Sequence, residues 1–151
     1  GGVGILALEP ISNKTQLGPF EAKKTMHDID REDLFILKIL SKDGSFISLD
    51  ASSETHCNWM ALVQVAKTEE EQNCMAYQLG ISIFFNTTRD LAVGDELKVW
   101  YAPQYAKKLN KSLSPDGKTK SMLGETLFAE AVDEEDENGN NRMEGEESRD
   151  A

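Results

Sequence analysis

Short apolar runs separated by turn residues occupy the first hundred positions of the chain. The runs 34–40 and 46–50 flank residues 42–45, which have the turn-forming pair Asp-Gly at their centre. This pattern predicts a β-hairpin. A second hairpin is expected over residues 76–87, with its bend near Gly80.

Shorter elements surround the two hairpins. Residues 5–8 are predicted to form a short strand, residues 97–101 a further strand and residues 103–109 a short helix. The Gly18-Pro19 pair lies in an apolar stretch, and a proline cannot donate to the centre of a sheet ladder. We therefore expect an edge or a bend there that tucks the following Phe20 under the sheet.

Three stretches give weaker patterns. Residues 23–33 are polar and are expected to form an excursion from the sheet. Residues 58–66 fit neither the helical nor the strand period, so a helical turn and a strand remain alternatives. Thr68 and Glu71 have the spacing of a capping box that would start a helix, and the alternative is an exposed turn. Many short strands with few helices indicate an all-β or β-dominated α+β domain.

Charge divides the chain into a domain and a tail. Residues 133–151 hold nine acidic and two basic residues, so this segment carries −7 of the total charge of −11. With so few apolar side chains it cannot recover the entropy of ordering, and we predict a disordered acidic tail. Residues 111–132, rich in Ser, Pro, Gly and Lys, are predicted to be a linker, which leaves residues 1–110 as the folded domain. The acidic balance argues against DNA binding through phosphate contacts.

The two cysteines and two histidines complete no zinc-ligand spacing, so no metal site is predicted. Cys57 and Cys74 are expected to be small buried thiols in a reducing compartment. No apolar leader or span of about 20 apolar residues is present, which predicts an intracellular, soluble protein without membrane contact. Because the chain begins with Gly1-Gly2 directly before an apolar run, we expect it to be part of a longer protein.

Five segments follow one another in a fixed order: GVGILAL, LGPFEA, CNWMALV, EEQNCMAYQ and DELKVWYAPQYA. Together they resemble a known family, the PR domain, a divergent branch of the SET-domain lysine methyltransferase fold. The resemblance covers residues 2–109 and implies a SET-like fold of several short antiparallel sheets with short helices. The strand-loop pattern of that family favours a turn, not a helix, at Thr68.

In SET enzymes the methyl donor is S-adenosylmethionine, and catalysis depends on holding the donor and a lysine amine in line. Carried over by position, the resemblance implies cofactor contacts at Gly2, Gly4, Asn58 and Trp59 and a catalytic role for Tyr101. Each has a structural alternative. The glycines fit a turn, Asn58 fits a residue that satisfies buried backbone groups, and the aromatic residues fit the core.

The resemblance leaves two functional hypotheses. Active SET enzymes carry an Asn-His-x-Cys motif, whereas this chain has His56-Cys57-Asn58-Trp59 at the corresponding place. This difference favours a non-catalytic module that binds chromatin-modifying or other transcription-regulatory proteins, or histone tails. The retained Gly-x-Gly and Tyr101 favour a histone-lysine methyltransferase. Either hypothesis implies a nuclear zinc-finger transcription regulator that contacts DNA through fingers outside this chain.

Overall fold

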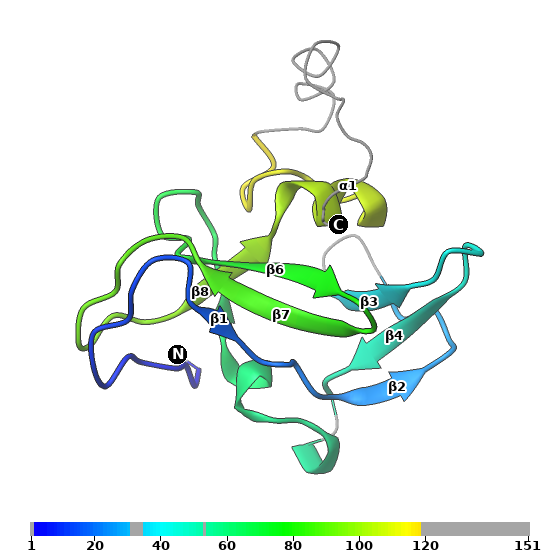
Figure 1. The fold of residues 1–151 in the computed structure, drawn as a ribbon, viewed down its shortest axis with the longest axis horizontal. Helices are drawn as coiled ribbons and strands as arrows, with labels where there is room; N and C mark the ends of the chain where they lie inside the picture. Colours follow the sequence, from blue (N-terminus) through cyan, green and yellow to red (C-terminus); the bar gives the residue numbers. More distant parts are fainter. Residues whose placement is uncertain (1, 31–34, 53, 119–151) are drawn as a thin grey trace. The chain divides into compact units, whose positions relative to one another are not determined.

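The computed structural model describes residues 2–30, 35–52 and 54–118. Two β-sheets and a short α-helix, α1, form within these residues (Figure 1). The predicted tail at residues 133–151 and most of the predicted linker lie outside the described residues, so both stay predictions.

The larger sheet is built around the second predicted hairpin, which is confirmed. Its strands, in spatial order, are β1 (Gln16–Leu17), β7 (Ser82–Thr87), β6 (Cys74–Leu79), β8 (Lys98–Tyr101) and β5 (Gln64–Val65). Strands β6 and β7 are antiparallel, and the bend between them places Gly80 at φ +65°. Strand β8 runs parallel to both β6 and β5. The predicted strand at residues 97–101 is therefore β8, one residue shorter.

The smaller sheet contains the first predicted hairpin, also confirmed, with the strand order β2–β4–β3. Its bounds are β2 (Lys23–Thr25), β4 (Phe46–Asp50) and β3 (Leu37–Leu40). The polar excursion predicted from residue 23 is wrong over β2. The side chains of Lys23 and Lys24 are exposed, and charged residues of this kind are common on edge strands such as β2, so the segment lacks the apolar alternation of a half-buried strand.

Short helical turns connect the strands. Residues 58–66 contain both alternatives, a 3-10 turn η2 (Trp59–Leu62) followed by β5, and a further turn η1 (Glu54–His56) precedes them. Helix α1 (Pro103–Leu109) is confirmed, with proline at its start, where no amide donor is needed. Thr68 begins a turn, as the family pattern favoured, and its hydroxyl accepts a hydrogen bond from the Glu71 amide at 3.3 Å.

The strand predicted at residues 5–8 is wrong. The chain there makes an isolated antiparallel bridge between Leu6 and Glu96. The Ala7 amide donates to the Asp95 carbonyl, and the Ala7 carbonyl accepts from the Gly94 amide, at 2.9 and 2.8 Å. Because these partners lie in a tight turn, the ladder cannot extend into a strand.

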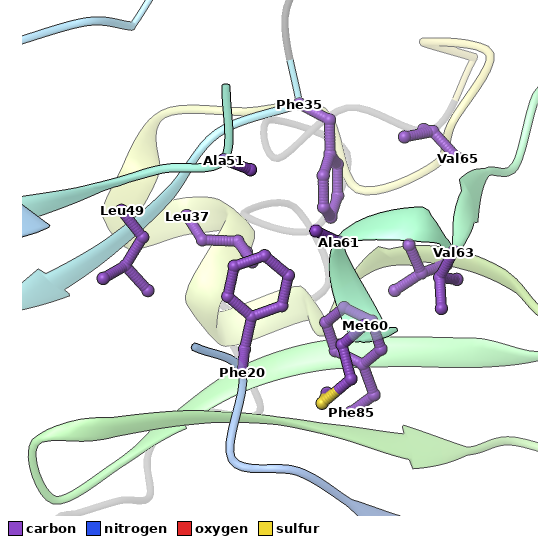
Figure 2. Close-up of a pocket in the computed structure, with 11 residues that line it drawn as sticks. Phe20, Phe35, Leu37, Leu49, Ala51, Met60, Ala61, Val63, Val65 and Phe85 are labelled. Atoms are coloured by element: carbon purple, nitrogen blue, oxygen red, sulfur yellow. The ribbon is translucent and has the colours of Figure 1, made fainter. Parts of the chain in front are cut away.

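The core lies between the two sheets. Phe20 packs there against Phe85, with ring centroids 5.9 Å apart, as expected for the bend after Gly18-Pro19. Figure 2 shows apolar side chains from both sheets and from η2 around a cavity of about 160 Å³. The residues lining it are Phe20, Phe35, Leu37, Leu49, Ala51, Met60, Ala61, Val63, Val65, Phe85 and Val99.

Candidate functional site

Tyr101, the predicted catalytic residue, ends β8 and is 1% exposed. Its hydroxyl donates to the Ile36 carbonyl at 2.7 Å and accepts from the Ile36 amide at 2.8 Å. The ring stacks on Phe35, with centroids 4.6 Å apart. Burial raises the pKa of the Tyr101 phenol well above its usual value, outweighing the opposing effect of the Ile36 bond. The hydroxyl is therefore neutral at physiological pH and held by backbone.

Asn58, a predicted cofactor contact, precedes η2 and connects it to the loop after β1. Its side-chain amide donates to the Pro19 carbonyl at 2.9 Å, and its side-chain oxygen accepts from the Glu21 amide at 3.2 Å. The Asn58 backbone amide also donates to the Glu21 carbonyl. These bonds match the structural alternative, a residue that satisfies backbone groups where a loop meets the core.

The two aromatic residues near these positions differ in burial. Trp59 is 42% exposed, so the expectation that it belongs to the core is wrong. The next residue, Met60, is 1% exposed and lines the cavity. In a short 3-10 turn adjacent side chains point in different directions, so the placement of Met60 in the core turns Trp59 outward. Trp100 packs against the core and donates its ring N–H to the Ser112 carbonyl at 3.0 Å.

The predicted glycine contacts, Gly2 and Gly4, lie beside β5 and the start of β8. The Gln64 side chain donates to the Val3 carbonyl between them. A Cβ atom at Gly4 would meet the Glu96 carboxylate, and one at Gly2 would lie 3.4 Å from the Gln64 side-chain nitrogen. The absence of a side chain at Gly4 thus makes room for Glu96.

These residues have different partners, so their role as one cofactor site stays a prediction. Gly2 and Gly4 have no side chains of their own, although the Glu96 carboxylate fills the space beside Gly4, and Asn58 retains a second amide hydrogen beyond its bond to Pro19. Both features fit a polar cofactor such as S-adenosylmethionine in part. Tyr101 fits less well, since its single O–H hydrogen already points to the Ile36 carbonyl.

Three polar residues outside the predicted site have central positions. One of them, Tyr105, is expected from the sequence to have a structural role on the short helix. Tyr105, on α1, accepts from the Lys38 amide at 2.9 Å and donates to the Lys38 carbonyl. The Gln78 side chain makes the equivalent pair with the backbone of Leu40, both at 2.9 Å. Asn73, 5% exposed, joins the Glu96 carbonyl and the Lys98 amide at 2.9 and 2.8 Å. Their partners are distant in sequence, so no local pattern could identify these contacts.

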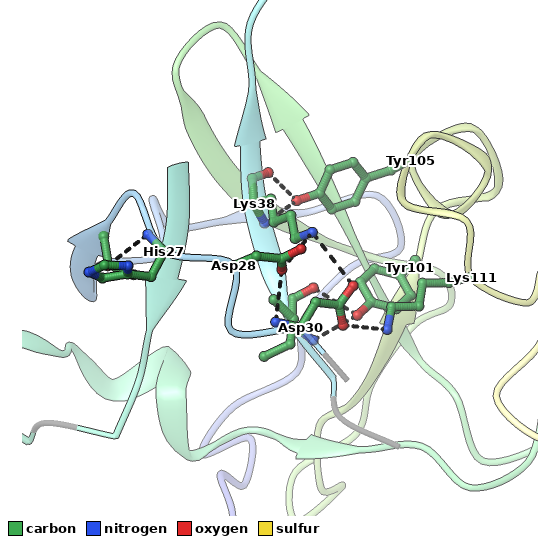
Figure 3. Close-up of polar contacts among 9 residues, drawn as sticks. His27, Asp28, Asp30, Lys38, Tyr101, Tyr105 and Lys111 are labelled. Carbon is green, nitrogen blue, oxygen red and sulfur yellow. Dashed lines mark hydrogen bonds and ion pairs between the residues drawn. The ribbon is translucent and has the colours of Figure 1, made fainter. Parts of the chain in front are cut away.

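A cluster of charges covers β3 near the two tyrosines (Figure 3). The Lys38 ammonium lies 3.3 Å from Asp28, 3.6 Å from Asp30 and 4.5 Å from the centre of the Phe46 ring. Lys111 pairs with Asp30 at 2.8 Å. The hydrogen bond from the Asp30 amide, with a smaller contribution from Lys38, lowers the pKa of Asp28 below its usual range. The cluster fixes residues 28–30 over β3.

Two features are absent from residues 2–30, 35–52 and 54–118. No group of three or more His, Cys, Asp or Glu side chains with metal-binding geometry occurs in that part of the chain. Within the same residues, no helix has the length and apolar character needed to cross a membrane.

The sequence matches a known family over residues 1–112, described as the PR domain of PR domain zinc finger protein 2. It is 43% identical over 113 residues to PR domain zinc finger protein 15 of Homo sapiens. It is 33% identical over 118 residues to PR domain zinc finger protein 10 of Xenopus tropicalis. These matches cover 75% and 73% of this chain, but the chain spans only about a tenth of each relative, 10% in both cases.

Solved structures show the same similarity in three dimensions. The methyltransferase domain of human PR domain-containing protein 2 matches with a TM-score of 0.59 and 27% identity, covering 66% of this chain and 68% of that one. The SET domain of the RIZ1 tumor suppressor matches with a TM-score of 0.56 and 26% identity, covering 71% and 68%. The predicted fold, a strand-dominated SET-like arrangement of small sheets, is confirmed.

Proposed function

This chain belongs to the PR domain family of zinc finger proteins, and on that premise we propose that it serves as a protein interaction module of a nuclear transcription regulator. The partners are chromatin-modifying or other transcription-regulatory proteins, or histone tails. DNA is contacted by zinc fingers outside this chain.

One observation carries the preference for an interaction module. The Tyr101 hydroxyl, which in an enzyme would orient the lysine amine, both donates to and accepts from the Ile36 backbone in a buried position. A general acid or base must reach the reacting group through a hydrogen bond of its own. Here the donor is already used, and the high pKa of the phenol opposes its ionisation.

A histone-lysine methyltransferase is the second candidate, favoured by the match to the methyltransferase domain of human PR domain-containing protein 2. In that case S-adenosylmethionine would supply an activated methyl group. The backbone of Gly2 and Gly4 and the second amide hydrogen of Asn58 would hold it. The apolar cavity walls would exclude water from the amine.

A cofactor titration separates the two candidates. We would titrate S-adenosylmethionine into the chain by calorimetry and incubate the same sample with a panel of histone peptides and labelled cofactor. The interaction module predicts no saturable heat and no methyl transfer. Saturable binding together with transfer would overturn that proposal and establish the enzyme.

The interaction itself needs a positive test in the full-length protein. Cells would express the tagged full-length protein with or without residues 2–118, and the recovered chromatin proteins would be identified by mass spectrometry. A set of regulators lost on deletion is the expected result. Equal recovery from both proteins would contradict the proposed role for this domain.

A further inference from the structure

The outer edge of β3 carries a row of three bond pairs, of which the candidate functions concern only the one made by Tyr101. Strand β3 pairs with β4 on one side, with Leu37 opposite Leu49 and Ile39 opposite Ile47. In an antiparallel pair the backbone groups of alternate residues face opposite edges of the strand. The amides and carbonyls of Ile36, Lys38 and Leu40 therefore face away from β4.

Each of these three backbone positions is paired with one side chain that acts as both donor and acceptor. Ile36 bonds with the Tyr101 hydroxyl, Lys38 with the Tyr105 hydroxyl and Leu40 with the Gln78 amide. Figure 3 shows the two tyrosine hydroxyls against this edge. The spacing of two residues between successive bonds is the spacing of a β-ladder.

The three side chains come from the other half of the domain. Gln78 lies on β6, Tyr101 on β8 and Tyr105 on α1. Tyr101 and Tyr105 are buried, and their rings contact edge to face with centroids 5.9 Å apart. Packing thus restricts the two tyrosine side chains, which lowers the entropy lost when their hydroxyls bond with Ile36 and Lys38.

We infer that Tyr101, Tyr105 and Gln78 form a side-chain ladder that replaces a fourth strand beside β3 and locks the three-stranded sheet onto the five-stranded sheet. Exposed β edges attract other strands, and proteins protect them in recognisable ways. The opposite edge, β2, has the exposed side chains of Lys23 and Lys24. The β3 edge instead has its backbone groups satisfied by side chains. This inference does not rest on the proposed function.

A side-chain ladder of this kind implies that its three bond pairs form and break cooperatively. If the three bond pairs act as one unit, loss of one pair lets the whole β3 edge separate from β6, β8 and α1 while the larger sheet stays formed. Such partial opening is measurable because the exchange of each backbone amide with solvent reports the opening that exposes it. The amides of Ile36, Lys38 and Leu40 are the reporters, and the Phe85 amide in β7 reports the larger sheet.

Native-state hydrogen exchange followed by NMR tests the inference on the variants Y105F and Q78M. In Y105F we expect the Ile36, Lys38 and Leu40 amides all to exchange about tenfold faster, with a smaller change at Phe85. Q78M should accelerate the same three amides. The matched control is Y77F, which also loses one phenol hydroxyl, but one bonded at 2.8 Å to the Gln16 side chain on the larger sheet. It should leave the three amides at their original rates.

Two results would overturn the ladder as a unit. Faster hydrogen exchange of the Lys38 amide alone in Y105F would show that the three bond pairs break independently of one another. Equal acceleration at Phe85 would show that the two sheets open only together, so that no lock lies between them. Tyr101→Phe is not needed for either outcome, so a folding failure of that variant would leave the test intact.

Discussion

At the scale of single residues, the buried polar side chains connect backbone segments that are far apart in sequence. Asn73 and Asn58 both do so, but Asn73 is 5% exposed whereas Asn58 is half-buried. A buried backbone group that loses its partner cannot turn to water, whereas a partly exposed one can. The two asparagines should therefore differ in their contribution to stability.

Replacing each asparagine by alanine tests this difference. We expect Asn73→Ala to lower the free energy of unfolding by about 2–3 kcal/mol, because the Lys98 amide and the Glu96 carbonyl lose their partners. Asn58→Ala should cost about 1 kcal/mol, since water can reach the Pro19 and Glu21 groups. Urea denaturation at pH 7 measures both. A cost for Asn58→Ala equal to that of Asn73→Ala would contradict the argument.

The buried tyrosines predict an alkaline loss of stability. Burial raises the pKa of Tyr105 above its usual value of 10.0, so the folded chain keeps a proton that the unfolded chain releases above that pH. The contribution of Tyr105 is fully present below pH 10 and falls by up to about 1.4 kcal/mol per pH unit above it.

Urea denaturation between pH 9 and pH 11.5 measures this dependence. Tyr105→Phe should show a shallower decline than the unchanged chain. Cys74, whose pKa burial raises to about 12, contributes equally to both proteins and cancels in the comparison. Parallel pH profiles would show that Tyr105 does not titrate differently in the two states.

At the scale of elements, the hairpin between β6 and β7 depends on the residue at its bend. Gly80 has φ +65°, and no atom lies within 4 Å of the position that a Cβ would occupy. A substitution there meets no steric obstacle, so its cost comes from the left-handed backbone alone.

Two substitutions at this bend measure the free-energy cost of its left-handed backbone conformation. Gly80→Ala should lower the free energy of unfolding by about 1 kcal/mol, because alanine disfavours a left-handed conformation. Gly80→Asn should cost about half as much, since asparagine adopts that conformation more readily. Thermal unfolding followed by circular dichroism shows which of the two variants loses more stability. Equal losses for the two variants would indicate that the backbone conformation is not the cause.

At the largest scale, that of the described domain, the two sheets pack on an apolar core that contains the partly open cavity of about 160 Å³. Protein interiors are close-packed, so the walls of a cavity lose dispersion contacts. Val63, which is 8% exposed, lines this space, whereas Val93 is 63% exposed on a turn.

Filling the cavity should stabilise the chain. Val63→Ile adds one methylene group inside the core, and we expect a gain of about 0.8 kcal/mol in the free energy of unfolding. Val93→Ile adds the same group in solvent and should change stability by less than about 0.5 kcal/mol. Guanidinium denaturation of the two variants makes the comparison. A loss of stability in Val63→Ile would show that the cavity walls cannot accept the added methylene.

For the predicted site, the sequence indicated which positions matter but not which groups they contact. The motifs identified Tyr101 and Asn58 as important positions, and the family they implied is confirmed. They did not show that the Tyr101 hydroxyl bonds with the backbone of Ile36, 65 residues away. Nor did they show that the Asn58 side chain bonds with the backbone of Pro19 and Glu21. The sequence predicts a structural role for Tyr105 but no partner for it or for Gln78, because both partners lie on β3, far away in sequence.

The sequence by itself determined the two hairpins, helix α1 and the family. Turn residues, apolar alternation and ordered motifs act over a few positions and are legible along the chain. Only the tertiary structure decided that residues 23–25 form an edge strand, that residues 5–8 do not form a strand, that Trp59 faces solvent and that three side chains close the β3 edge. Each of these outcomes depends on which distant backbone groups come together, and local propensity carries no information about them.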